Sequence, residues 1–108
     1  MKRSLALLAL SLAAFAASAA DEMTLTIKNH TFEPKELVVP AGKKIKLTVV
    51  NQDATPAEFE SKQLNREKII PGKSSAVIMI GPLKAGRYSF VEEFHEKESG
   101  AQGTIIVH

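Results

Sequence analysis

The sequence predicts an all-β fold, a single Greek-key antiparallel β-sandwich over residues 21–108. In several segments of four to eight residues, apolar and polar side chains alternate with period two, which is typical of a strand with one buried face. Turns that contain Pro or Gly separate these segments at short intervals, and no long helical periodicity follows residue 20. Short strands between such turns favour a sandwich.

The first twenty residues have the pattern of a secretory signal peptide. Lys2 and Arg3 precede an apolar run over residues 5–17, and small residues lead to Asp21. The run is too short for a spanning helix. We therefore expect export to the periplasm with cleavage near Ala20, and no membrane insertion of the mature domain, residues 21–108. A retained N-terminal anchor is the alternative.

The charge balance of the mature domain excludes some partners. The chain has 14 Lys and Arg and 12 Asp and Glu, and removal of Lys2 and Arg3 leaves 12 against 12, a net charge of zero. Nothing then favours binding to nucleic acid or to an acidic membrane surface. The chain has no Cys, which excludes disulfides and thiolate chemistry.

The strands are predicted from the periodicity in chain order. They cover residues 23–28, 36–39, 44–51, 75–80, 87–91 and 103–107, with turns at 40–42, 71–72 and 81–86. In the segment 75–80 an apolar run, Ala-Val-Ile-Met-Ile, follows Ser75, so we expect a strand buried on both faces or close to it, with Met79 in the core. Residues 62–69 fit either a short helical turn or an irregular crossover.

Two segments near the C-terminus, Gly-Arg-Tyr-Ser-Phe at 86–90 and Gly-Thr-Ile-Ile-Val at 103–107, resemble the end of a cupredoxin. In that family the first strand leads to a Cys, a His and usually a Met. The resemblance implies a cupredoxin-like sandwich and places Glu92 at the Cys position and His95 at the His position. The Met position falls near Gly100 or Ala101. Ala57 stands where many cupredoxins have their first His.

If the resemblance holds, three groups of donors converge: a strand around Phe59, the segment 62–69 and the last loop. The expected metal ligands are His95, Glu93, Glu92, Glu58, Glu60 and Glu67. Imidazole and carboxylates suit iron, manganese, Cu(II) or zinc, and without a Cys they cannot form a blue-copper site. At strand spacing Glu58 and Glu60 share one face, opposite Phe59.

The choice between Glu92 and Glu93 stays open. The two point to opposite sides if the strand continues that far, and Glu93 then shares a side with His95, whereas Glu92 holds the Cys position. The other polar residues have simpler interpretations. Glu96 and Glu98 flank Lys97 as in a solvated loop, and no role is predicted for His30 or His108.

Four further segments narrow the resemblance: 58–61 (Glu-Phe-Glu-Ser), 66–72 (Arg-Glu-Lys-Ile-Ile-Pro-Gly), 80–88 (Ile-Gly-Pro-Leu-Lys-Ala-Gly-Arg-Tyr) and 93–95 (Glu-Phe-His). They are similar to cysteine-free cupredoxin-like proteins related to the EfeO-type domain, including FtrB-like components of bacterial ferrous-iron transport. The resemblance implies an exported protein that binds an iron or copper ion and handles or oxidises ferrous iron. Its partner would be an inner-membrane iron permease or another periplasmic component.

Two other functions are compatible with the same residues. One is a periplasmic type-2-like carrier of copper or zinc, and the other is a metal-free sandwich that binds a partner protein through the carboxylate-rich loop. A ferroxidase-type activity is the only enzymatic expectation. Hydrolase chemistry has no support, because no Ser or Cys nucleophile lies in a recognisable motif with a base.

Overall fold

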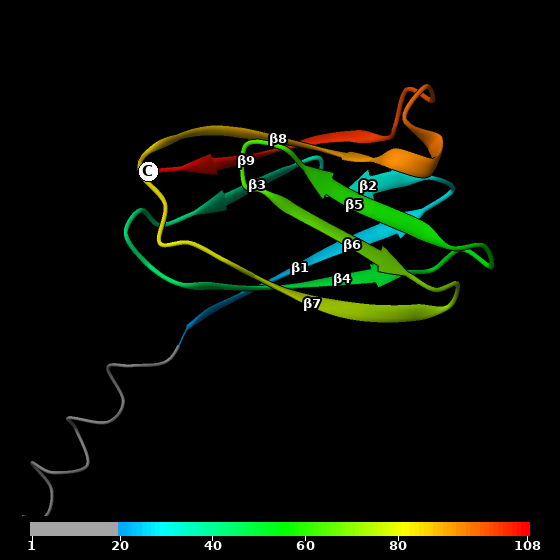
Figure 1. The fold of residues 1–108 in the computed structure, drawn as a ribbon, viewed down its shortest axis with the longest axis horizontal. Helices are drawn as coiled ribbons and strands as arrows, with labels where there is room; N and C mark the ends of the chain where they lie inside the picture. The colour runs from blue at the N-terminus through cyan, green and yellow to red at the C-terminus, as the bar shows by residue number, and fades with distance from the viewer. Residues whose placement is uncertain (1–19) are drawn as a thin grey trace, which may run out of the picture.

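The computed structural model describes residues 20–108, which fold into two packed β-sheets (Figure 1). The predicted signal peptide lies outside the described residues except for Ala20. Within residues 20–108, no helix has the length and hydrophobicity needed to cross a membrane.

The first sheet has four strands, in the order β2 (Thr31–Glu33), β1 (Asp21–Lys28), β4 (Ile45–Asn51) and β7 (Ser74–Ile80). The second sheet has five strands, in the order β3 (Glu36–Val39), β9 (Gln102–Val107), β8 (Gly86–Glu92), β5 (Ala57–Ser61) and β6 (Arg66–Ile70). A short 3₁₀ turn, η2 (Glu93–His95), follows β8. The predicted β-sandwich is confirmed.

Both sheets are mixed. β1 pairs with β4 in parallel and β3 pairs with β9 in parallel, while the remaining pairings are antiparallel. The chain after β1 turns back into β2, passes to the opposite sheet as β3 and returns as β4. β4 lies on the side of β1 away from β2 and runs parallel to β1. Each sheet therefore has one parallel pairing within an otherwise antiparallel arrangement.

The core explains the period-two pattern. In β4 every second side chain is buried, from Ile45 to Asn51, and the three between them, Lys46, Thr48 and Val50, are partly exposed. Three fully buried rings close the core at one end: Phe90 packs edge-on against Phe32 at 4.8 Å and is stacked with Phe59 at 5.1 Å between ring centroids. Such contacts contribute ~0.5–1.5 kcal/mol beyond burial. These rings lie on β8, β2 and β5, next to the loops that carry the candidate ligands.

The expectation for residues 75–80 was wrong in one respect. β7 is an edge strand with one face toward solvent: Ile78 and Ile80 are buried, whereas Val77 is 46% and Met79 is 42% exposed. Met79 is therefore not a core residue. A run of apolar residues does not show which face of a sandwich strand lies outside.

Residues 62–69 are neither a helical turn nor an irregular crossover. A tight turn over residues 62–65 leads into β6, which pairs with β5 as a hairpin. Asn65 has a φ of 55°, in the left-handed region that Asn tolerates better than most residues. Only Ile70 of β6 is buried, so this edge strand has no apolar alternation.

Candidate metal site

The candidate site lies at the end of the sandwich where β8 passes into η2. The loop from η2 to β9 is held by its own backbone: the amide of Glu98 donates to the carbonyl of His95 at 2.9 Å, and the amide of Ala101 donates to the carbonyl of Glu98 at 3.1 Å. The amide of Phe32 on β2 donates to the carbonyl of Gly100 at 3.2 Å. The loop is thus fixed to both sheets.

Glu92 is a buried charged side chain at the base of this loop. It is 0% exposed, and its Oε1 accepts hydrogen bonds from the backbone amides of Glu58 at 2.8 Å and Phe94 at 3.1 Å. Its other oxygen pairs with Nδ1 of His95. A buried carboxylate is tolerated when it is hydrogen-bonded, and here both oxygens of Glu92 have partners.

The structure separates the two glutamates between which the sequence left the choice open. β8 ends at Glu92, and the 3₁₀ turn changes the direction of the chain, so the period-two relation between Glu93 and His95 does not apply. Instead His95 lies three residues beyond Glu92, one turn away, and bonds to it. Glu93 turns toward β5.

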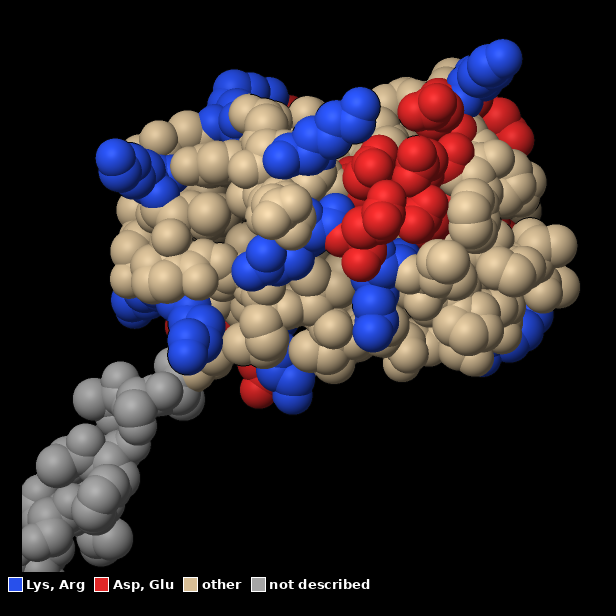
Figure 2. Space-filling model, in the orientation of Figure 1, with Lys and Arg blue, Asp and Glu red and all other residues tan. Residues whose placement is uncertain are grey.

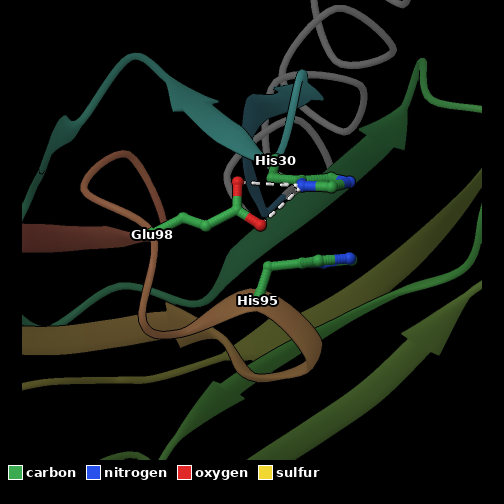
Figure 3. Close-up of side chains that lie close together, drawn as sticks. All are labelled: His30, His95 and Glu98. Atoms are coloured by element: carbon green, nitrogen blue, oxygen red, sulfur yellow. Dashed lines mark hydrogen bonds and ion pairs between the residues drawn. The ribbon is translucent and has the colours of Figure 1, made fainter.

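His95 lies face to face with His30 from the turn between β1 and β2. The ring centroids are 3.4 Å apart and the planes differ by 14°. Both carboxylate oxygens of Glu98 lie 3.0 Å from Nδ1 of His30 (Figure 3). One donor atom from each of His30, His95 and Glu98 lies within 4.8 Å of the others, close enough for a common ion after small movements.

Asp53 holds the turn that carries His30. Asn29 and His30 both have positive φ, 54° and 58°, and their amides donate to Asp53 at 2.7 and 2.9 Å. Burial alone would raise the pKa of the Asp53 carboxyl, but these two backbone N–H groups and the charges of His30 and Lys73 lower it below its usual value. The ionised carboxylate therefore stabilises an otherwise unfavourable turn.

Four carboxylates gather beside this group, on the outer face of the β5–β6 hairpin. Oxygens of Glu58, Glu67 and Glu93 lie within 4.8 Å of one another. Glu60 lies directly opposite Glu67 in the strand register. Figure 2 shows a continuous acidic patch on this side of the molecule. We call Glu58, Glu60, Glu67 and Glu93 the carboxylate cluster.

The cluster is electrostatically unfavourable in the absence of a cation. Burial, a hydrogen bond with Glu93 and the charges of Glu67, Glu93 and Glu60 raise the pKa of Glu58 to about 7. Burial and then the charge of Glu93 also raise the pKa of Glu60. Among the described residues, no Lys or Arg forms an ion pair with any of the four. Like charges directly opposite on paired strands destabilise a sheet, and a bound cation would remove that cost.

The six predicted ligands thus fall into two adjacent groups. Glu58, Glu60, Glu67 and Glu93 form the carboxylate cluster, while Glu92 and His95 form a bonded pair beneath the loop. The amide of Glu58 donates to Glu92, which connects the groups. As expected, Glu58 and Glu60 share a face opposite buried Phe59.

Sequence reasoning assigned no role to His30 or Glu98, which the structure places beside His95. His30 is 65 residues from His95, and only the packing of the two sheets brings them together. One signal was available in the sequence: Asn-His between two alternating segments indicates a tight turn, because Asn and His are both enriched at positive φ.

A blue-copper centre does not fit these residues. The Cys position implied by the resemblance holds Glu92, whose oxygens are already taken by two amides and by His95. At the first His position, Ala57 is buried and offers no donor atom. A thiolate is required for blue copper, and the chain has none.

Comparison with known proteins agrees with the fold. The cupredoxin-like domain family matches residues 3–107. The uncharacterized protein RP394 of Rickettsia prowazekii (strain Madrid E) is 45% identical over 87 residues, which are 81% of this chain and 68% of that protein.

Solved structures share the architecture at low sequence identity. Auracyanin A, a blue copper protein of Chloroflexus aurantiacus, superposes with a TM-score of 0.70 at 13% identity, over 83% of this chain and 100% of that one. The metal-binding domain of the Cu(I)-exporting P-type ATPase CopA of Streptococcus pneumoniae D39 gives 0.67 at 15% identity, over 81% and 84%. The match over residues 3–107, together with the two-sheet topology, shows that the chain belongs to the cupredoxin-like domain family.

Proposed function

We propose that this protein is an exported, periplasmic metal-binding protein that handles or oxidises ferrous iron, with copper as a second ion, for an inner-membrane iron permease. Export is supported by the signal-peptide pattern of residues 1–20. The iron substrate is supported by the resemblance to EfeO-type and FtrB-like proteins and by the chemistry of the carboxylate cluster. An intact mass that begins within one residue of Asp21 would support export, and retention of Met1 would contradict it.

The observation that carries the proposal is the convergence of Glu58, Glu67 and Glu93. Their oxygens lie within 4.8 Å of one another, and Glu60 adds a fourth carboxylate next to Glu67. Anionic oxygen donors are hard ligands and bind a trivalent ion more strongly than a divalent one. The cluster would therefore stabilise Fe(III) relative to Fe(II) and lower the potential of the bound iron.

A lower potential favours oxidation of the substrate. Each Fe(II) would lose one electron to an acceptor such as Cu(II) or dioxygen. The chain's own contribution is to bind the ion, to supply the negative charge that favours the ferric state, and to hold the cluster on β5, β6 and η2. Because the pKa of Glu58 is about 7, the cluster changes charge near neutral pH. Iron binding should therefore strengthen as the pH rises through this range.

Copper is the second metal for which there is support. The solved relatives include a domain described with Cu(I) and a blue copper protein, both under 25% identical to this chain. Imidazoles lie next to the carboxylate cluster, and imidazole suits copper. The periplasmic copper or zinc carrier stays a second candidate for this reason.

The test compares iron binding and ferrous-ion oxidation by the mature protein and three variants. Glu58→Gln and Glu67→Gln each remove one carboxylate from the cluster, and Glu22→Gln removes one from an exposed position on β1. We expect the two cluster variants to lose at least ~10-fold in Fe(III) affinity and to slow oxidation. The Glu22→Gln variant should match the wild type.

Two results would contradict the proposal. Equal behaviour of all variants would remove the cluster as the iron site. Calorimetry that detects no binding of iron, copper or zinc would favour the metal-free module that binds a partner protein through the loop.

A further inference from the structure

Two histidines from distant parts of the chain form a second group of donors. His30 belongs to the β1–β2 turn and His95 to η2, and their rings stack with centroids 3.4 Å apart. Figure 3 shows the outer nitrogen ends of both rings directed to the same side. Since His30 and His95 are partly exposed, with side chains 31% and 23% accessible, an ion can reach them from solvent.

A carboxylate contacts the Nδ1 atom of each of the two imidazole rings. Nδ1 of His95 is paired with buried Glu92, and Nδ1 of His30 lies 3.0 Å from Glu98. A hydrogen bond at one ring nitrogen fixes the proton there and leaves the lone pair on the other. Among the described residues, Nε2 of neither His30 nor His95 has a hydrogen-bond partner. Imidazoles oriented by carboxylates in this way are typical of metal ligands.

Both rings are also fixed through the backbone. The turn of His30 is held by Asp53, and η2 is held by Glu92, whose Oε1 accepts the amide of Phe94 at 3.1 Å. The three carboxylates around the stacked rings, Glu92, Glu98 and Asp53, give the site negative charge that attracts a cation.

We propose that His30, His95 and Glu98 bind one borderline divalent transition-metal ion, Cu(II) most tightly and Zn(II) less tightly. His95 contributes Nε2, because its Nδ1 is held by Glu92. His30 contributes one ring nitrogen. Glu98, which is exposed on its loop, exchanges its present contact with Nδ1 of His30 for the ion and supplies an oxygen. The in-plane lone pairs of the stacked rings are nearly parallel, with 14° between the planes, so ion binding rotates at least one ring out of the stack.

The donor set selects the ion. Two nitrogens and one oxygen suit copper, zinc and nickel better than calcium or magnesium, which take oxygen ligands. Among divalent ions of the first transition row, affinity reaches its maximum at Cu(II). The two sites therefore prefer different ions: the histidine site prefers Cu(II), and the oxygens of the carboxylate cluster favour Fe(III). Neither site shares a donor residue with the other, so each can exist without the other.

The experiment titrates the metal-free mature protein with Cu(II), and separately with Zn(II) and Ca(II), by calorimetry. His30→Asn removes the imidazole and keeps a residue that tolerates the positive φ of 58°, so the turn should fold. His108→Asn at the exposed C-terminus is its control. Glu98→Gln removes the carboxylate, with exposed Glu96→Gln as its control. Two-dimensional NMR of the imidazoles with Zn(II) reports which rings bind.

The expected result is a loss of at least ~10-fold in Cu(II) affinity for His30→Asn and Glu98→Gln, with wild-type affinity for both controls. Any Ca(II) bound by the carboxylate cluster should be the same in all variants. Zn(II) should shift the ring signals of His30 and His95 and leave those of His108 in place. Wild-type Cu(II) affinity in folded His30→Asn would overturn the proposal and leave the stack as a packing contact. Iron binding by the Glu58→Gln variant is measured separately, so failure of either site is distinguishable from failure of the other.

Discussion

Nδ1 of His95 donates a hydrogen bond to the carboxylate of Glu92, which is fully buried at the end of β8. The same carboxylate accepts two backbone amides, from β5 and from η2. Glu92 therefore connects the central strands of the second sheet to the loop that carries the candidate ligands. Glu92 thus has a structural role, and Nε2 of His95 remains available for an ion.

The first prediction is that Glu92→Gln destabilises the fold. Gln keeps the size and one acceptor oxygen but loses the charge that strengthens three hydrogen bonds. We expect a cost of ~1–3 kcal/mol. For a domain of this size each 1 kcal/mol lowers Tm by about 4–8 °C, which thermal denaturation followed by circular dichroism will measure. Exposed Glu96→Gln is the control, and equal Tm values for the two variants would be inconsistent with this role.

The second prediction concerns the pH dependence of stability in metal-free protein. The pKa of Glu58 is raised to about 7 in the folded state, above its value in the unfolded chain. This group's contribution to folding is therefore fully present below about pH 4.5 and is lost as the pH rises through about 7. The stability of wild type relative to Glu58→Gln should fall between pH 5 and 8. A difference that is constant across this range would show that Glu58 titrates normally.

The third prediction is that Asp53→Ala disturbs the stacked rings from a distance. The variant removes the acceptor for the amides of Asn29 and His30, whose positive φ values are unfavourable without it. We expect a loss of ~1–3 kcal/mol in stability. The ring protons of His95 should also shift in the NMR spectrum, because the stack with His30 opens. Unchanged ring signals in a folded variant would mean that the turn between β1 and β2 keeps its conformation without Asp53.

The fourth prediction is that copper-loaded protein is nearly colourless. The intense band of a blue-copper centre requires a Cys sulfur bound to Cu(II), and this chain has no Cys. Visible absorption should show only weak bands of nitrogen- and oxygen-bound Cu(II). An intense charge-transfer band would require a ligand that the chain does not contain.

Local patterns in the sequence predicted most of the sandwich, because alternation and Pro/Gly turns report directly on strands with one buried face. They failed for β6 and for the exposed side of β7 for one physical reason. Edge strands are only partly covered, so Ile70 is the single buried residue of β6, and Val77 and Met79 of β7 face solvent. Composition does not distinguish an exposed apolar side chain from a buried one.

The candidate site was predictable to the extent that it is local. Glu58 and Glu60 share a strand face, and the β5–β6 hairpin places Glu67 opposite Glu60. The contact of His30 with His95 depends on how two sheets pack, which no short pattern contains. The separation of Glu92 from Glu93 depends on where β8 ends and η2 begins.

The most direct test of the central claim is the metal content of the protein purified, without added metal, from cells that express it. Elemental analysis by mass spectrometry should find iron or copper close to stoichiometric with the protein, and Glu58→Gln combined with Glu67→Gln should lose iron while the fold stays intact. A wild-type protein that carries neither iron nor copper, and takes up neither when both are supplied, would contradict the account.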